Sequence, residues 1–223
     1  MSIETRDIRR ILRQAKTFPP DMPAFDADAA PDEPLGLLVD WLSAAIEAGV
    51  NQPHAMTLST CDSTGHVTAR TLLLKDVDDA LWFASSDESP KGRQMAENPH
   101  VALTLYWREQ GRQIRVEGQA QPGPAEVGAA DFTARHPDSR AVAIALPQSS
   151  AYDPGSQEPQ ARLAAARELV AQDDDFAPDD WTAYRVVPTV VEFWQATTGR
   201  DQVRLRYDRV GEGTGWTSTR LWP

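Results

Sequence analysis

Apolar residues repeat at helical spacing in the segment between Pro34 and Gly49. Leu35, Leu38 and Leu42 fall on one face, and Pro34 suits the first turn of a helix. The pattern predicts an amphipathic helix that packs on a hydrophobic core, and Gly49 marks its end.

Beyond residue 54 the spacing changes to short runs with β-branched and alternating apolar positions, separated by turn sequences. Strands are predicted over residues 55–61, 66–75, 81–85, 101–107, 112–119, 181–187, 190–194 and 203–208, with 216–221 as a candidate for one more. Helices are predicted near 90–97, 124–135 and 157–172, with a Pro- and Ser-rich loop over 147–154. Antiparallel strands with helices confined to connections predict a mainly β (α+β) fold, a β-barrel with peripheral helices.

The first 33 residues differ from the rest. A short basic amphipathic stretch is followed by a Pro- and Asp-rich linker without a packing pattern. We therefore expect an N-terminal arm and linker over 1–33, loosely docked, and a single domain over 34–223.

Composition narrows the class of protein. The chain has 223 residues, 41% of them hydrophobic, enough for a sizeable core. Asp and Glu number 33 against 22 Lys and Arg, so we expect no nucleic-acid partner. No apolar run is long enough to span a membrane, and the N-terminal residues lack the apolar region of a secretory signal. With Cys61 as the single cysteine, a cytoplasmic protein is expected.

The residues that could carry chemistry begin with an apolar run bracketed by two cations, Arg70 and Lys75. It is predicted to be a buried strand whose charged ends lie in water, against carboxylates or against an anionic ligand. Further polar groups follow in order: Ser89-Pro90-Lys91-Gly92-Arg93, Gln113, Gln148-Ser149-Ser150, Glu192-Phe193-Trp194-Gln195, Arg200 and Arg204.

Taken together, these residues resemble the pyridoxamine 5'-phosphate oxidase family over roughly residues 34 to 223. The resemblance implies an FMN-binding split β-barrel, antiparallel and Greek-key-like, with the cofactor at the interface of a homodimer. It implies FMN contacts from Arg70, Thr71, Leu72, Leu73, Leu74, Lys75, Ala84, Ser85, Lys91, Gln113, Gln148, Ser149, Trp194 and Arg204, some of them from the second subunit. Pro90 replaces an Arg of the family, so one phosphate cation is missing unless Arg93 reaches the site.

The resemblance also implies a small-molecule substrate held by Lys75, Arg135, Ser139, Arg200 and Gln202, with Arg200 and Gln202 in catalytic positions. The substrate half departs from the family pattern. Asp131 stands where the family has Tyr, and Gln202 stands where it has His, so the titratable proton of that side chain is lost. The family's N-terminal Arg-x-x-Tyr is absent.

Three functions remain open at this point. The first is an FMN-dependent oxidase that converts pyridoxamine or pyridoxine 5'-phosphate to pyridoxal 5'-phosphate, with oxygen as electron acceptor. The second is an FMN oxidase of another reduced heterocycle, because Leu105–Glu109 and Leu205–Arg209 are similar to the phenazine-biosynthesis flavin oxidases. The third is a flavin-binding protein without turnover. The four histidines show no metal-ligand spacing, so no metal is expected.

Overall fold

The computed structural model describes residues 8–15, 17–151, 153, 155, 158–199, 201–211 and 213–223. Its strands are β1 (Ala55–Cys61), β2 (Val67–Leu73), β3 (Asp76–Val77), β4 (Leu81–Ser86), β5 (His100–Trp107), β6 (Arg112–Pro122), β7 (Trp181–Gln195), β8 (Val203–Arg209) and β9 (Trp216–Arg220). Its helices are α1 (Ile8–Arg13), α2 (Pro34–Glu47), α3 (Pro90–Glu97), α4 (Ala125–Thr133), α5 (Pro137–Ala145) and α6 (Glu158–Gln172).

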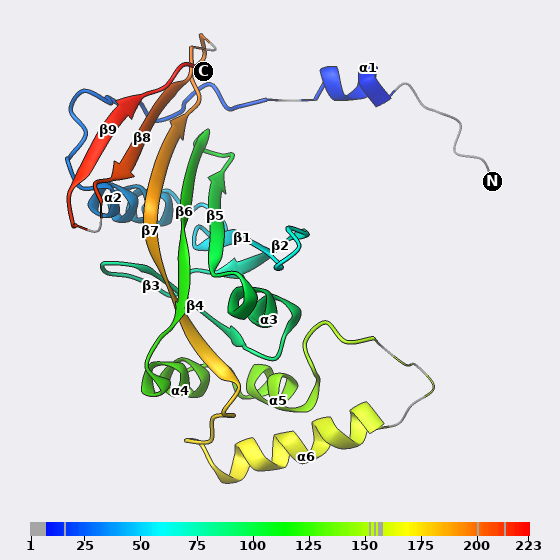
Figure 1. The fold of residues 1–223 in the computed structure, drawn as a ribbon. Coiled ribbons are helices and arrows are strands. Elements are labelled where there is room, and N and C mark those ends of the chain that lie inside the picture. Colours follow the sequence, from blue (N-terminus) through cyan, green and yellow to red (C-terminus); the bar gives the residue numbers. More distant parts are fainter. Residues whose placement is uncertain are drawn as a thin grey trace.

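The strands form one antiparallel sheet in the order β2-β1-β5-β6-β7-β4-β3, with β8 and β9 continuing from β7 (Figure 1). Strand β7 is the axis of the fold. One of its edges pairs with β6 along its length. The other edge pairs with β4 over Trp181–Val186 and with β8 over Val190–Gln195. The sheet therefore divides at the middle of β7, and its two ends carry different neighbours.

The two strands predicted over 181–187 and 190–194 are one strand, which corrects the sequence prediction. Pro188 lacks a backbone N–H, but it lies opposite a register shift between Glu117 and Gly118. Gly118 is required there, since a Cβ atom would lie 2.2 Å from the carbonyl oxygen of Val187. The bulge accommodates the proline, and β7 continues through it.

A second correction concerns the run from Arg70 to Lys75, which was predicted to be buried. The strand ends at Leu73 and is the edge of the sheet, pairing with β1 alone. Its residues are only partly covered, and Leu73 is 40% exposed. Leu72 still packs against the core, but Leu72 and Leu73 also line a hollow, so this edge strand leaves apolar surface for a ligand.

Helix α2 covers the inner face of the sheet and closes the core. Leu38, Trp41 and Ala45 are buried against strand residues such as Leu103 and Phe193. The Trp41 and Phe193 rings meet edge to face with centroids 5.2 Å apart. The amphipathic stripe read from the sequence is thus confirmed as core packing.

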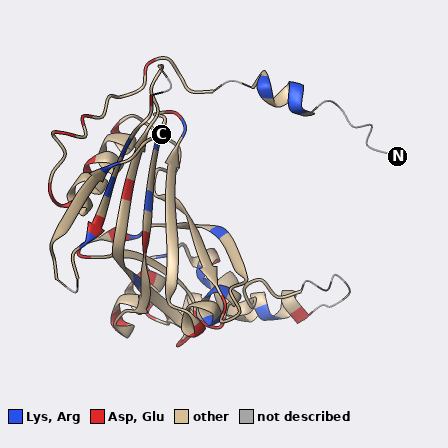
Figure 2. Ribbon diagram, turned by 45° about the horizontal axis from the view of Figure 1, so that its top comes forward, with Lys and Arg blue, Asp and Glu red and all other residues tan. Residues whose placement is uncertain are grey.

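Residues 17–33 pack along the sheet, so the expected lack of packing is wrong for this segment. Phe25 contacts the Trp41 ring at 5.0 Å, and the Tyr207 hydroxyl donates to the Pro31 carbonyl at 2.7 Å. Asp28 pairs with Arg220 at 3.1 Å. The basic helix α1 is exposed and stands away from the sheet at the end of this strap (Figures 1 and 2).

Helices α4, α5 and α6 lie together at the end of the sheet where β7 begins (Figure 1). Helix α5 was not predicted. Pro137 begins it, and the His136 ring nitrogen Nδ1 accepts from the Asp138 N–H as a cap. The buried guanidinium of Arg140 ties α5 to the loop after α6 by donating to the carbonyls of Asp174 and Phe176 at 2.7 and 3.1 Å. In the described part of the chain, no helix has the length and apolar character to cross a membrane.

Candidate active site

A hollow of about 420 Å³ lies between the end of β2, strand β4 and helix α5, and we call it the main pocket. It collects half of the residues that the sequence assigned to cofactor and substrate. Its lining comprises Thr71, Leu72, Leu73, Lys75, Ala84, Ser85, Arg135, His136, Ser139, Gln148 and Trp181. Leu74, also assigned to the cofactor, is buried in the core instead.

Two cations, Arg70 and Lys91, lie beside this pocket. Lys91 is only 8% exposed, and its Nζ donates to Ser89 Oγ at 3.0 Å and to Gln148 Oε1 at 2.8 Å. Burial, and then the charge of Arg70, lowers the pKa of Lys91 to about 8. Arg70 donates to the Thr60 hydroxyl at 2.7 Å, and burial lowers its pKa too.

Within the described part of the chain, neither cation is ion-paired with a carboxylate. A buried cation without a counterion is costly unless it meets an anion. Arg70, Lys91, Ser85 and Gln148, which we call the phosphate-end site, therefore fit the terminal phosphate of a mononucleotide. Ser85 joins the group by donating to Gln148 Oε1 at 3.2 Å.

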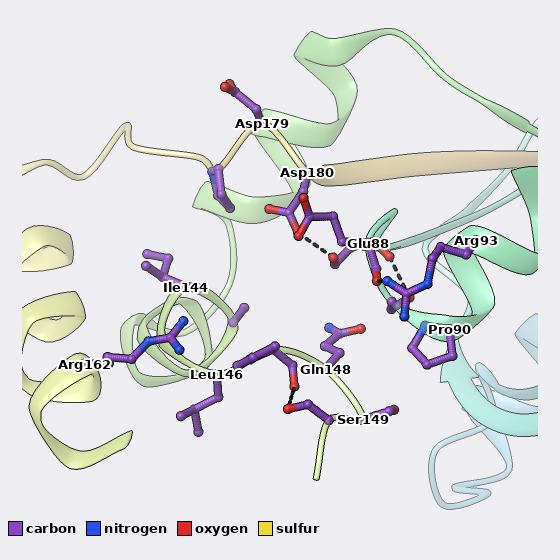
Figure 3. A pocket seen from close by; sticks show the side chains of 16 residues that line it. Glu88, Pro90, Arg93, Ile144, Leu146, Gln148, Ser149, Arg162, Asp179 and Asp180 are labelled. Atoms are coloured by element: carbon purple, nitrogen blue, oxygen red, sulfur yellow. Dashed lines mark hydrogen bonds between the residues drawn. The ribbon is translucent and has the colours of Figure 1, made fainter. Parts of the chain in front are cut away.

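Arg93 does not take the place of the cation that Pro90 removes. It lines a neighbouring hollow of about 510 Å³, where its guanidinium donates to the Glu88 carbonyl (Figure 3). Ser149 lines the same neighbouring hollow and not the main pocket. The structure thus separates these two predicted phosphate ligands from the main pocket.

On the substrate side of the main pocket, one of the two cations is paired with a carboxylate. Lys75 Nζ lies 3.1 Å from Asp131 Oδ1, and Asp131 Oδ2 accepts from Trp181 Nε1 at 3.0 Å. The Arg135 guanidinium lies 4.1 Å from the centre of the Trp181 ring. Burial lowers the pKa of Arg135, and the nearby Asp131 charge opposes that shift. Arg135 also donates to the Ser139 carbonyl at 3.4 Å.

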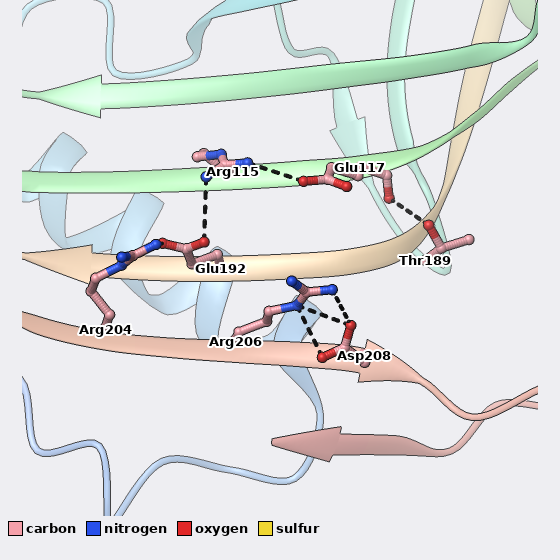
Figure 4. Close-up of polar contacts among 7 residues, drawn as sticks. All are labelled: Arg115, Glu117, Thr189, Glu192, Arg204, Arg206 and Asp208. Atoms are coloured by element: carbon pink, nitrogen blue, oxygen red, sulfur yellow. Dashed lines mark hydrogen bonds and ion pairs between the residues drawn. The ribbon is translucent and has the colours of Figure 1, made fainter. Parts of the chain in front are cut away.

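The remaining predicted residues form a second set at the other end of β7. Gln113, Trp194 and Arg204 are direct neighbours across β6, β7 and β8. Trp194 Nε1 donates to Gln202 Oε1 at 2.8 Å. Arg204 holds the buried Glu192 carboxylate through bonds of 2.7 and 2.9 Å (Figure 4).

The two sets are too far apart to meet one mononucleotide within a single chain. Trp181 belongs to the main pocket, and Trp194 lies near the opposite end of the same strand. At about 3.3 Å per residue, the path along β7 between them is roughly 40 Å. A complete site on this plan needs the second set from another copy. The predicted catalytic residue Arg200 lies outside the described residues.

Two family models match the chain. Residues 42–170 match pyridoxamine 5'-phosphate oxidase, and residues 181–223 match the pyridoxine 5'-phosphate oxidase C-terminal dimerisation region. The chain belongs to the pyridoxamine 5'-phosphate oxidase family. The second match indicates a homodimer, as expected from the sequence.

Relatives in this family match the chain over most of its length. A pyridoxine/pyridoxamine 5'-phosphate oxidase of Hyphomonas neptunium is 39% identical over 194 residues, which cover 86% of this chain and 88% of that protein. One of Paraburkholderia phymatum is 38% identical over 204 residues, covering 90% and 93%. Membership of this oxidase family confirms an oxidoreductase and supports FMN as the cofactor.

Solved structures agree with the fold. PhzG from Burkholderia lata, in complex with tetrahydrophenazine-1-carboxylic acid, superposes with a TM-score of 0.81 at 32% identity and covers 91% of this chain and 98% of that one. A pyridoxamine 5'-phosphate oxidase-related, FMN-binding protein from Nostoc punctiforme shares the fold with a TM-score of 0.69 at 16% identity, covering 84% and 96%. The predicted split barrel is confirmed.

Sequence reasoning missed two residues of this pyridoxamine 5'-phosphate oxidase family site. Trp181 orients Asp131 and supports Arg135, yet in the sequence it is only the first residue of a strand. Phe18 contacts the Trp194 ring at 5.6 Å from the N-terminal strap. Neither contact has a local pattern, because each joins segments far apart in the chain.

Proposed function

We propose that the chain is an FMN-dependent oxidase that converts pyridoxamine or pyridoxine 5'-phosphate to pyridoxal 5'-phosphate with oxygen as electron acceptor. The observation that carries the proposal is the similarity to oxidases of that name over most of the chain, with 39% identity over 194 residues for one of them. Lys75, Arg135 and Ser139 on one pocket wall support it. A cytoplasmic location, expected from the sequence, is part of the proposal.

In such a reaction, different residues would bind the cofactor and the substrate. FMN, when bound, supplies the acceptor for two electrons. The phosphate-end site would hold its phosphate, and Gln113, Trp194 and Arg204 of the second copy would complete its surroundings. The substrate loses a hydride from the carbon that is oxidised and a proton from its amine or hydroxyl group. Oxygen takes up the two electrons and two protons to become hydrogen peroxide, and in the amine case water then hydrolyses the imine and releases ammonia.

Protein groups contribute positioning and charge to this reaction. Arg135 and Ser139 offer donors at one end of the pocket, and Arg200 is proposed to contact the substrate near the carbon that is oxidised. Gln202 carries no titratable proton, so it can orient the substrate but cannot transfer a proton. Its amide oxygen is already fixed by Trp194 at 2.8 Å.

One observation favours a second candidate, oxidation of another reduced heterocycle such as a dihydrophenazine. The Lys75–Asp131 ion pair, 3.1 Å long, compensates a cation that a substrate phosphate would use. The similarity to PhzG, whose structure holds a tetrahydrophenazine carboxylic acid, agrees with this alternative.

Anaerobic reduction of the bound flavin separates the candidates. Pyridoxamine 5'-phosphate, mixed with the FMN-loaded dimer without oxygen, is expected to bleach the flavin absorption. Bleaching by a dihydrophenazine carboxylate alone would overturn the proposal in favour of the second candidate. Bleaching by neither would leave a flavin-binding protein without turnover.

The role proposed for Arg200 has its own test. Arg200→Ala is expected to lower kcat/KM for pyridoxamine 5'-phosphate by about a hundredfold or more, because one charge-assisted contact to the reacting substrate is lost. FMN content, measured by absorbance after gel filtration, should stay at the wild-type level. Loss of FMN together with activity would instead place Arg200 in the cofactor site.

A further inference from the structure

Lys75 stands on the wall between two hollows. It lines the main pocket and also a smaller hollow of about 220 Å³ that contains Asp131. Asp76 and Asp78 line the smaller hollow as well, so its charge is mostly negative. The Lys75 ammonium is thus shared between a substrate pocket and an acidic recess.

Asp131 is held firmly in that recess. Its Oδ1 lies 3.1 Å from Lys75 Nζ, and its Oδ2 accepts from Trp181 Nε1 at 3.0 Å. The Asp131 side chain is 15% exposed, against 40% for that of Lys75. Both carboxylate oxygens therefore have a fixed partner, and the more buried member of the pair is the acid.

The charges that remain for a substrate anion are few. Arg135 is stacked on Trp181 and, within the described residues, is not ion-paired with a carboxylate. The His136 ring is engaged with Asp138 at the start of α5, where Nδ1 accepts the Asp138 N–H at 3.3 Å and lies 3.7 Å from the Asp138 carboxylate. Lys75, Asp131 and Arg135 together leave one net positive charge. That matches a singly charged group better than a phosphate dianion, which favours two cationic partners.

We infer that Asp131 determines specificity by competing with a substrate phosphate for Lys75, so that the site distinguishes poorly between phosphorylated and unphosphorylated ligands. The inference rests on the proposed function, because it takes the main pocket to be the substrate site. A phosphate must either displace the Asp131 carboxylate or lie beside it, and both cost binding free energy through like-charge repulsion.

Asp131→Asn tests the inference directly. Asn keeps the size of the side chain and an oxygen that can accept from Trp181, but it removes the charge. On the FMN-loaded dimer, equilibrium dialysis should show pyridoxal 5'-phosphate binding about tenfold tighter to the variant than to the wild type, and pyridoxal unchanged within about twofold. Asp131→Ser carries the same test if the Asn variant does not fold.

Two further variants make the test specific. In a Lys75→Met background, Asp131→Asn should no longer tighten pyridoxal 5'-phosphate, because the cation freed by the substitution is gone. Asp79→Asn removes one carboxylate from an exposed pair with Arg185, 2.7 Å long, and should leave both ligands unaffected.

The inference is overturned if wild type and Asp131→Asn bind pyridoxal 5'-phosphate equally, if neither binds it measurably, or if pyridoxal gains as much affinity as its phosphate. Turnover of pyridoxamine 5'-phosphate is scored separately. Tighter phosphate binding by the variant without any turnover would retain the inference and reject the proposed function.

Discussion

Two lysines of this protein show how one side-chain type serves two ends of a site. Lys91 is buried, bonded to a hydroxyl and an amide oxygen, and holds a pKa of about 8. Lys75 is more exposed and already paired with Asp131 at 3.1 Å. Among the described residues Lys91 has no carboxylate partner, so the phosphate-end site is poised to bind a strong anion. At the substrate end the same charge is compensated internally.

The largest effect should come from removing the uncompensated cation. Lys91→Ala is expected to weaken FMN about 10- to 100-fold, because a charge-assisted bond to a phosphate contributes about 1.5–3 kcal/mol. Fluorescence titration of the apoprotein with FMN measures this. Arg93→Ala removes a cation from the same helix but from the neighbouring hollow, and should change affinity by less than about threefold. Equal losses in both variants would contradict the assignment of the phosphate-end site.

The pH dependence of FMN affinity tests the same lysine without changing the sequence. Burial holds the pKa of Lys91 at about 8 in the free protein, and a bound phosphate favours the charged form. Affinity should therefore be retained below pH 8 and fall as pH rises through it, by about tenfold between pH 7 and 9. The FMN phosphate, with a second pKa near 6, stays a dianion over this range. A profile in Lys91→Ala as steep as that of the wild type would assign the titration to another group.

A smaller effect is expected from weakening the contacts of Asp131 at the substrate end of the main pocket. Trp181→Phe keeps an aromatic ring beneath Arg135 but removes the N–H that holds Asp131 Oδ2. The free energy of unfolding should fall by about 1–2 kcal/mol, since a partly buried acceptor loses its partner. Urea denaturation at fixed protein concentration measures it, because the stability of a dimer depends on concentration. Trp82→Phe, which removes a comparable N–H bond to the exposed Asp78, is the matched control.

The smallest effect provides the sharpest contrast between the two ends. Asp131→Asn should change FMN affinity by less than about twofold, because its carboxylate compensates Lys75 and not the phosphate-end cations. The same apoprotein titration measures it. A change as large as that of Lys91→Ala would show that the two ends are electrostatically one site.

The sequence by itself determined most of the elements and the family. Periodic apolar positions predicted α2, β5 and β6 closely, because a helix stripe and a strand alternation are local properties of the chain. The ordered series from Arg70 to Arg204 pointed to the oxidase family and its cofactor. Patterns of this kind also predicted which residues would gather in the main pocket, Lys75, Ser85 and Arg135 among them.

Only the tertiary structure decided which charges meet. The pairing of Lys75 with Asp131, and the hydrogen bond from Trp181 to Asp131, join three segments that are distant in the chain. The placement of β2 at a sheet edge and the passage of β7 through Pro188 depend on strand order and on the bulge at Gly118. Local sequence patterns predict which positions are apolar. They do not predict which distant residue packs against or pairs with a given side chain, because burial and ion pairing depend on long-range packing.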